Sequence, residues 1–213
     1  KGIEYYKDRD RGLPYKEDLW VPGYFELPIK KGESIIFSAS TFVAKPEEFE
    51  KTYEDEIATR TTRTSFYNCL KNSAKQFYYK KDDEMYIMAG YPWLNVRARD
   101  ELMALPGCTL SIDHKKDFET IMDTLVSALQ RYINTGEKHR NIKEIDLPDI
   151  SLWAIWAIQQ YKRAYGNEEC LEKYGHVVKY LVEAIREERI YNLFLNDNGL
   201  LSTNGQNSPV TWL

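Results

Sequence analysis

The feature that most constrains the fold is a pair of helical segments with different hydrophobic patterns. The segment Ile150–Ile158 is apolar nearly all round and contains Trp153 and Trp156, which is typical of a helix buried on every side. The segment 168–191 is apolar on one face, as an outer helix is. A buried helix followed by a half-exposed one predicts helices in concentric layers. A toroid of inner and outer helices and an ordinary helical bundle both satisfy this pattern.

Helical periodicity extends over most of the C-terminal part of the chain. An amphipathic face runs along 117–134, and Gly136 lies just past its end, where glycine commonly terminates a helix. A short extended run, Met85–Ala89, and a loop, Gly90–Trp93, precede the helices. The predicted helices are 99–106, 117–134, 150–165 and 168–191.

The N-terminal part has a different sequence pattern, without helical periodicity in its first 44 residues. Residues 1–44 read as strands and turns, with antiparallel strands predicted at Tyr24–Ile29 and Ser34–Ser38. Two strands alone are marginally stable in water, so we expect them to be the end of a larger sheet. From Pro46 the spacing becomes helical and predicts a linker helix over 46–79, interrupted near Thr59–Thr64. The predicted division is therefore 1–44, a linker helix over 45–80, and a helical domain over 81–213.

Composition excludes several classes of function. The formal charge of −4 comes from interspersed acids and bases, so we expect no nucleic-acid partner. The longest apolar run, Leu152–Ile158, is too short to span a bilayer. Three widely spaced cysteines without a Cys-x-x-Cys motif favour a reducing compartment, and we expect the cytoplasm. Scattered histidines and the lack of a phosphate-cradling glycine loop indicate neither a metal site nor a cofactor.

Two polar positions at predicted helix starts are candidate binding residues. Arg99-Asp100 offers a guanidinium beside a carboxylate, a combination that can hydrogen-bond adjacent hydroxyls of a sugar. The structural alternative is that Asp100 favours the helix dipole and Arg99 is its surface partner. Asp149 precedes the most apolar helix, where a carboxylate caps the N-terminus for structural reasons; its functional alternative is a sugar-hydroxyl acceptor, with Trp153 one turn further.

Trp212 is the last candidate binding residue. It follows the glycine-containing loop 200–206 and is expected to act as a stacking platform or a plug. Asn196–Gly199 superficially suggests a calcium loop, but it lacks the alternating acids and distal glutamate of such loops, so a simple turn is expected.

Several ordered motifs carry a family resemblance. Ala89-Gly90-Tyr91-Pro92-Trp93, then Arg99-Asp100 and Ala104-Leu105-Pro106-Gly107, resemble the signature of the amylo-α-1,6-glucosidase part of glycogen debranching enzymes. Asp149-x-x-x-Trp153 and the segment from Asp197 to Trp212 resemble later motifs of that family, and 9–23 resembles the end of its preceding β-sandwich domain. One departure lies at Arg97-Ala98, where the family usually has Trp-Gly.

The resemblance implies a mainly α fold: an incomplete (α/α)6 toroid, preceded by the last strands of a β-sandwich domain and a linker helix. It implies hydrolysis of α-1,6-linked glucose stubs of glycogen limit dextrin by an inverting mechanism with two carboxylates. The family's catalytic acid would follow Leu213 and its base comes later, so no catalytic residue is expected within the chain and the isolated chain is expected to be inactive. The implied substrate-binding residues are Trp93, Arg99, Asp100, Asp149 and Trp212.

Two alternatives remain open at this point. A related toroidal glycosidase of glucoamylase or trehalase type would use an Arg-Asp glucose clamp equally well. A non-catalytic glycan-binding module would use the same residues without hydrolysis. The expected partner in each case is glycogen or another α-glucan.

Overall fold

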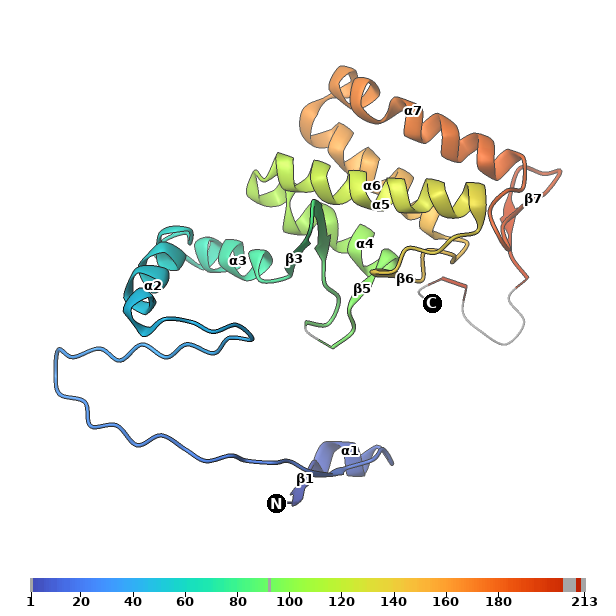
Figure 1. Ribbon diagram of the computed structural model, residues 1–213. Helices are drawn as coiled ribbons and strands as arrows, with labels where there is room; N and C mark the ends of the chain where they lie inside the picture. The colour runs from blue at the N-terminus through green and yellow to red at the C-terminus, as the bar shows by residue number, and fades with distance from the viewer. Residues whose placement is uncertain (1, 92, 205–209, 212–213) are drawn as a thin grey trace. The chain divides into compact units, whose positions relative to one another are not determined.

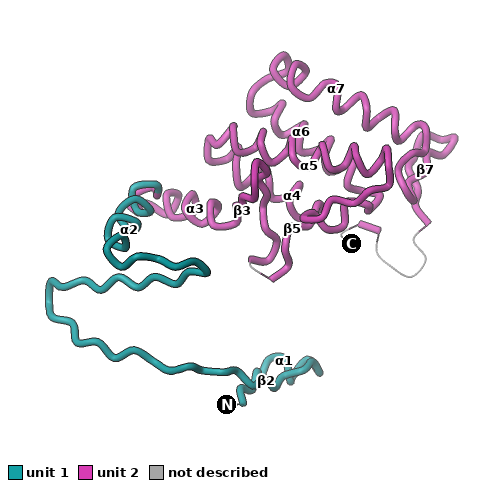
Figure 2. Tube along the Cα trace, in the orientation of Figure 1, with its two compact units in different colours: residues 1–59 teal, residues 60–213 magenta. Residues whose placement is uncertain are grey.

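The computed structural model describes residues 2–91, 93–204 and 210–211. The chain divides into two compact units, residues 1–59 and residues 60–213 (Figure 2). The second unit contains the long helices (Figure 1).

The first unit opens with a small antiparallel pair. Strand β1 (Gly2–Glu4) pairs with β2 (Lys16–Asp18), with Ile3 opposite Glu17, and helix α1 (Tyr6–Asp10) connects them. A long irregular segment, 19–45, follows. A single 3₁₀ turn (Pro46–Glu48) then leads into α2 (Phe49–Ala58), which begins where Pro46 fixes the backbone for a helix.

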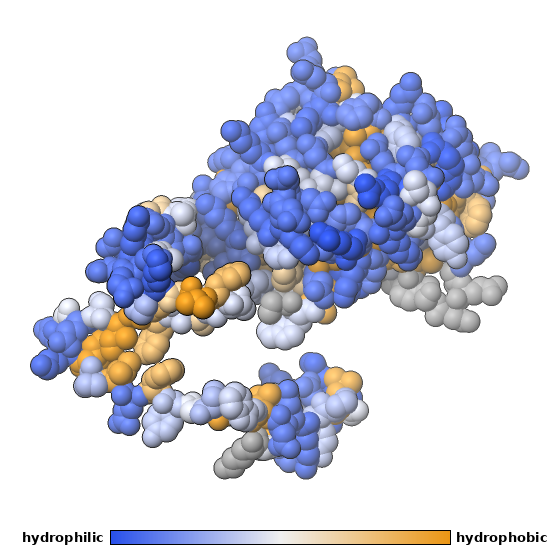
Figure 3. All heavy atoms as spheres, in the orientation of Figure 1, coloured by the Kyte–Doolittle hydropathy of each residue, from blue (hydrophilic) through white to orange (hydrophobic). Residues whose placement is uncertain are grey.

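The strands predicted at Tyr24–Ile29 and Ser34–Ser38 are wrong, because both segments are irregular in the structure. The two segments do approach each other, since the rings of Phe25 and Phe37 lie 5.8 Å apart. Among the described residues no strand pairs with either segment, and Pro28 has no N–H to donate to a ladder. Apolar side chains are accordingly exposed along this unit (Figure 3).

The predicted linker helix is not continuous. Helix α2 ends at Ala58, and α3 (Phe66–Lys75) starts a new helix in the second unit. The Ser65 side chain accepts a hydrogen bond from Asn68 N at 3.2 Å, which is an N-terminal cap of α3. The break lies at the threonine-rich stretch where the sequence indicated an interruption.

The second unit combines four longer helices with short strand pairs. Strands β3 (Tyr78–Lys81) and β4 (Glu84–Ile87) form a hairpin, and β5 (Val96–Arg97) pairs in parallel with β6 (Ile142–Lys143). A 3₁₀ turn (Leu110–Ile112) follows α4, and β7 (Phe194–Leu195) pairs with β8 (Leu201–Ser202) after the last helix. The helices are α4 (Ala98–Cys108), α5 (Lys115–Thr135), α6 (Ile150–Tyr165) and α7 (Asn167–Arg186).

Helix α6 is the centre of this unit. It packs against both α4 and α7, and its residues Ile150, Ala154 and Tyr161 are completely buried. Its opposite side is open, because Leu152 is 37% and Trp156 36% exposed. The prediction that this helix is buried on every side is therefore wrong for the described residues, whereas the mainly α class is confirmed. Among these residues, no helix combines the length and apolarity needed to cross a membrane.

Candidate functional site

The centre of the candidate site is a buried ion pair between α4 and α6. Arg99 Nε donates to Asp149 Oδ2 at 2.8 Å and Arg99 Nη2 donates to Asp149 Oδ1 at 2.9 Å. Both side chains are 11% exposed. This two-pronged geometry fixes the guanidinium plane, and charge-assisted bonds of this kind are the strongest orienting contacts available to the two groups. The N-terminal ends of two core helices are thus locked together.

Asp149 is held from a third direction by Trp153. The indole Nε1 donates to Asp149 Oδ2 at 3.1 Å, and the Trp153 ring meets Trp156 edge-on at 5.4 Å. The Asp149 side chain makes no capping bond to α6, although the residue occupies the N-cap position. The structural alternative of a capping role for this carboxylate is therefore wrong, because its oxygens are directed to Arg99 and Trp153 instead.

Arg99 and Asp100 do not face each other. The Asp100 carboxylate is 32% exposed and lies 3.6 Å from Arg97 Nε. Arg97 itself donates to Glu144 at 3.1 Å through Nε and at 2.6 Å through Nη2. The pKa of Arg97 is raised chiefly by its hydrogen bonds to Glu144. Two adjacent arginine–carboxylate groups therefore result, one buried and one partly exposed.

The C-terminal segment reaches the buried pair. Arg99 Nη2 donates to the backbone carbonyl of Val210 at 3.3 Å. Val210 precedes Trp212 by two residues, and Trp212 itself lies outside the described residues. A contact between positions 111 residues apart leaves no signal in local sequence patterns.

Trp93 lies in a closed loop that leads into β5 and α4. Ala89 N donates to Asn95 O at 2.8 Å, and Trp93 N donates to Gly90 O at 2.9 Å. Gly90 has φ +47°, and a Cβ there would lie 2.7 Å from the Leu94 side chain. The loop thus needs glycine at this position. Trp93 is 79% exposed, which leaves its ring accessible for stacking.

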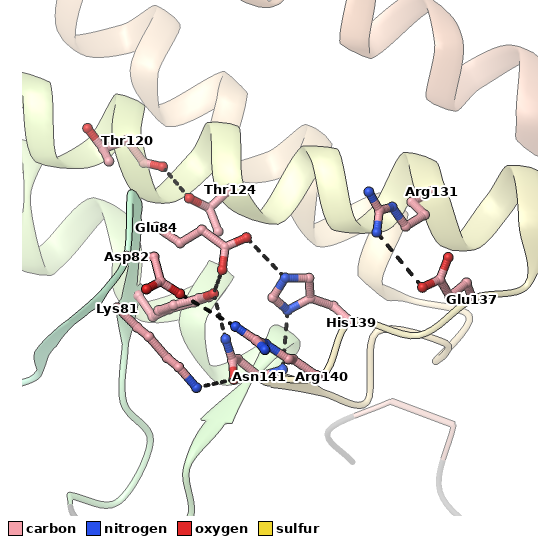
Figure 4. A network of polar contacts seen from close by, with 11 residues as sticks. Lys81, Asp82, Glu84, Thr120, Thr124, Arg131, Glu137, His139, Arg140 and Asn141 are labelled. Atoms are coloured by element: carbon pink, nitrogen blue, oxygen red, sulfur yellow. Dashed lines mark hydrogen bonds and ion pairs between the residues drawn. The ribbon is translucent and has the colours of Figure 1, made fainter.

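A polar network joins β4 to the segment just before β6, the strand that pairs with β5 (Figure 4). Asn141 N donates to His139 Nδ1 at 3.3 Å, so Nε2 carries the hydrogen and donates to Glu84 at 3.1 Å. The Tyr86 hydroxyl also donates to Glu84, and this bond is the main reason that the pKa of Glu84 is lowered. Asn141 adjoins β6, which pairs with β5, and β5 leads directly into Arg99 and α4.

Sequence patterns gave no reason to single out Glu101, which follows Asp100 on α4. Its side chain is 1% exposed, and Oε1 accepts from Ile87 N at 2.8 Å. Oε2 has no hydrogen-bond partner among the described residues. Burial raises the pKa of this carboxyl to about 8. The bond to Ile87 anchors α4 to the end of β4, from which the Trp93 loop departs.

In the part of the chain that the structure describes, the site is built from charged hydrogen-bonding groups and aromatic rings. There, no group of three or more His, Cys, Asp or Glu side chains is arranged to hold a metal ion. The three cysteines are free. The arginines, carboxylates and tryptophans instead provide hydrogen bonds and a stacking surface.

Comparison with known proteins gives two family matches. The family model for amylo-alpha-1,6-glucosidase matches residues 57–213, and the model for the glycogen debranching enzyme N-terminal region matches residues 1–36. No curated protein and no solved structure gives a significant match. The first family model covers more than half of the chain, and on that basis the chain belongs to the amylo-α-1,6-glucosidase family of glycogen debranching glycoside hydrolases.

Proposed function

We propose that this chain forms the glucose-binding wall of a cytoplasmic debranching enzyme that hydrolyses α-1,6-linked glucose stubs of glycogen limit dextrin. The observation that carries the proposal is the buried Arg99–Asp149 pair. A guanidinium and a carboxylate held rigid and shielded from water can recognise the hydroxyls of one glucose in a fixed orientation.

Unused hydrogen-bonding capacity supports this role for Arg99. The guanidinium has five N–H donors. Nε and Nη2 are directed to Asp149 and Val210, and Nη1 has no hydrogen-bond partner among the described residues. Nη1 is therefore the group that we assign to a sugar oxygen. Asp149 Oδ1 accepts one bond from Arg99 and retains a lone pair for a sugar hydroxyl.

The remaining candidates take supporting roles in the proposal. Trp93 supplies an exposed aromatic face for the sugar ring, and Asp100 supplies a partly exposed carboxylate. Trp212 is proposed to shape the pocket further along the segment that contacts Arg99. In the proposed reaction an acid protonates the glycosidic oxygen and a base activates water on the opposite face, which inverts the anomeric centre. None of the residues named here supplies either group.

The test compares two arginines two positions apart. In the full protein that carries this chain, we expect Arg99→Lys to lower kcat/KM for glucose release from glycogen limit dextrin about 10- to 100-fold, because lysine cannot reproduce the fork. Arg97→Lys is the matched control and should change kcat/KM less than about twofold, since its pair is one-third exposed. Urea unfolding of each variant separates loss of binding from loss of fold.

The choice of substrate tests the proposal independently. The parent enzyme should release glucose from a singly branched α-1,6 dextrin far faster than from linear maltose. Preference for maltose would assign the chain to a toroidal glycosidase of glucoamylase or trehalase type. An unchanged kcat/KM in Arg99→Lys would contradict the role of the buried pair.

A further inference from the structure

Strand β4 ends with a backbone N–H that its own sheet cannot satisfy. In the pairing with β3, Ile87 lies opposite Tyr78, and the next residue, Met88, donates through N to Phe77 O at 2.8 Å. Because hydrogen bonds alternate along an antiparallel strand, the N–H of Ile87 points away from β3. No second strand pairs with β4 in the part of the chain that the structure describes. Ile87 is 3% exposed, so this N–H needs an acceptor from elsewhere in the fold.

Glu101 on α4 supplies that acceptor. Its Oε1 atom accepts from Ile87 N at 2.8 Å, between positions 14 residues apart in the chain. Oε2 has no hydrogen-bond partner among the described residues, and the side chain is 1% exposed. Within the described residues, the bond from Ile87 is therefore the polar contact that holds this buried carboxyl.

The segment that this bond closes carries several of the candidate sugar contacts. Loop 88–95 leaves β4, carries Trp93, and returns through β5 to the start of α4, where Arg99 lies. The far end of the loop is fixed by β5, which pairs with β6. The near end is held by β3 on one side and by Glu101 on the other. The helix that presents Arg99 thus also holds the start of the loop that presents Trp93.

Glu101 accepts the Ile87 N–H in its neutral form near neutral pH. Burial raises the pKa of this carboxyl to about 8, and the bond from Ile87 lowers it by less. An ionised Glu101 is a buried charge whose second oxygen has no donor among the described residues. Burying a carboxylate without a paired charge is costly, so ionisation favours arrangements in which water reaches it. Ionisation therefore loosens the contact between α4 and the start of the loop.

The groups around Glu101 do not compensate an ionised carboxylate. Tyr86 on β4 is an ionisable neighbour: burial is the first cause of its raised pKa, and the charge of Glu101 is a smaller one. On α4, Arg99 and Asp100 are engaged by other partners. Among the described residues, no charge on α3, α5 or α6 is a cause of the raised pKa of Glu101.

We propose that Glu101 is a positioning residue that ties the Trp93 loop, residues 88–95, to the helix that carries Arg99. This rests on the proposed function, in which Trp93 stacks on the sugar and Arg99 bonds it. A fixed loop presents both groups in one arrangement before the substrate arrives, which lowers the free-energy cost of binding. Loss of the tie raises KM, whereas kcat changes little because neither Trp93 nor Arg99 supplies the acid or the base.

The test uses the full protein that carries this chain. Glu101→Met removes the acceptor and keeps a side chain of similar length, so the buried Ile87 N–H is left unsatisfied. We expect hydrogen exchange of loop 88–95 to become about tenfold faster and KM for limit dextrin to rise about tenfold, with kcat within about twofold. Glu101→Gln keeps the acceptor and should restore both values to within about twofold of the parent.

Two further measurements separate positioning from stability. Leu181→Ala truncates a completely buried side chain on α7, which packs on α6 and β7. It should lower the urea midpoint while leaving KM and the exchange of loop 88–95 unchanged. The second measurement needs only the parent and Glu101→Gln: the ratio of the parent KM to the variant KM should rise about fivefold from about pH 6.5 to about pH 9.

Three results would overturn the inference. The first is an equal KM in the parent and Glu101→Met, and the second is a tenfold rise in KM for Leu181→Ala as well. The third is a KM ratio of parent to Glu101→Gln that stays flat across the pH range. The proposed function fails separately: an unchanged kcat/KM in Arg99→Lys together with a raised KM in Glu101→Met contradicts the sugar contact and leaves the tie of the loop standing.

Discussion

The buried carboxyl of Glu101 makes stability depend on pH in a direction that can be worked out from the structure. The side chain is 1% exposed and accepts one bond, from Ile87 N. Burial raises its pKa from 4.5 to about 8. At neutral pH the folded protein therefore keeps a proton that the unfolded chain releases.

The sign follows from the two pKa values. Because the folded-state pKa lies above the unfolded value, the contribution of Glu101 to stability is fully present below pH 4.5 and is lost as the pH rises toward 8. Within this window, each pH unit lowers the free energy of unfolding by about 1.4 kcal/mol. From pH 5 to pH 7.5 the loss amounts to roughly 3 kcal/mol.

The perturbation is Glu101→Gln, which cannot titrate and can still accept from Ile87 N. We expect the free energy of unfolding of the variant, relative to the parent, to rise by about 3 kcal/mol between pH 5 and pH 7.5. Urea unfolding followed by tryptophan fluorescence measures it. Glu168→Gln, at an exposed position on α7, is the control for the loss of one carboxyl at the surface. A flat difference for Glu101→Gln would refute the reasoning.

Three further substitutions test the surroundings of the candidate site. Asp149→Ala leaves Arg99 buried without its carboxylate, and we expect urea curves to give a loss of about 3–5 kcal/mol. Gly90→Ala forces a side chain into contact with Leu94 at a positive φ; we expect a loss of about 1–3 kcal/mol and faster amide hydrogen exchange across the 89–95 loop. Arg97→Ala removes a partly exposed pair; thermal melts should show a loss below about 1 kcal/mol that shrinks further in high salt.

The helices of the second unit were predictable because their periodicity is strong. Helix α6 has the predicted bounds, 150–165, and α5 extends two residues before and one beyond its predicted range. The end of α7 was not predictable: the pattern continued to 191, whereas the helix stops at Arg186. There Glu188 adopts φ +53° and the chain turns so that Ile190 packs back against the end of the helix. Helical spacing cannot distinguish that return from another turn of helix.

The strands predicted at 24–29 and 34–38 in the first unit are absent for a different reason. Residues 24–29 and 34–38 contain strand-forming residues, but a strand exists only when another strand satisfies its backbone groups. Tyr24, Phe25 and Phe37 are 86%, 84% and 64% exposed, so neither segment is packed against a sheet. Composition indicates the capacity to form a strand, and the pairing partner decides whether one forms.

In the candidate site, the contact between Arg99 and Asp149 could not be predicted from residues adjacent in sequence. Successive residues on an α-helix point about 100° apart, and Arg99 and Asp100 contact different partners from the first turn of α4. Arg99 faces α6 and bonds Asp149, 50 residues away, whereas Asp100 faces Arg97. The sequence analysis singled out Arg99, Asp100 and Asp149, but it placed Arg99 beside Asp100 and not beside Asp149. Helix packing, which brings the starts of α4 and α6 together, creates the charge pair that the proposed sugar contact requires.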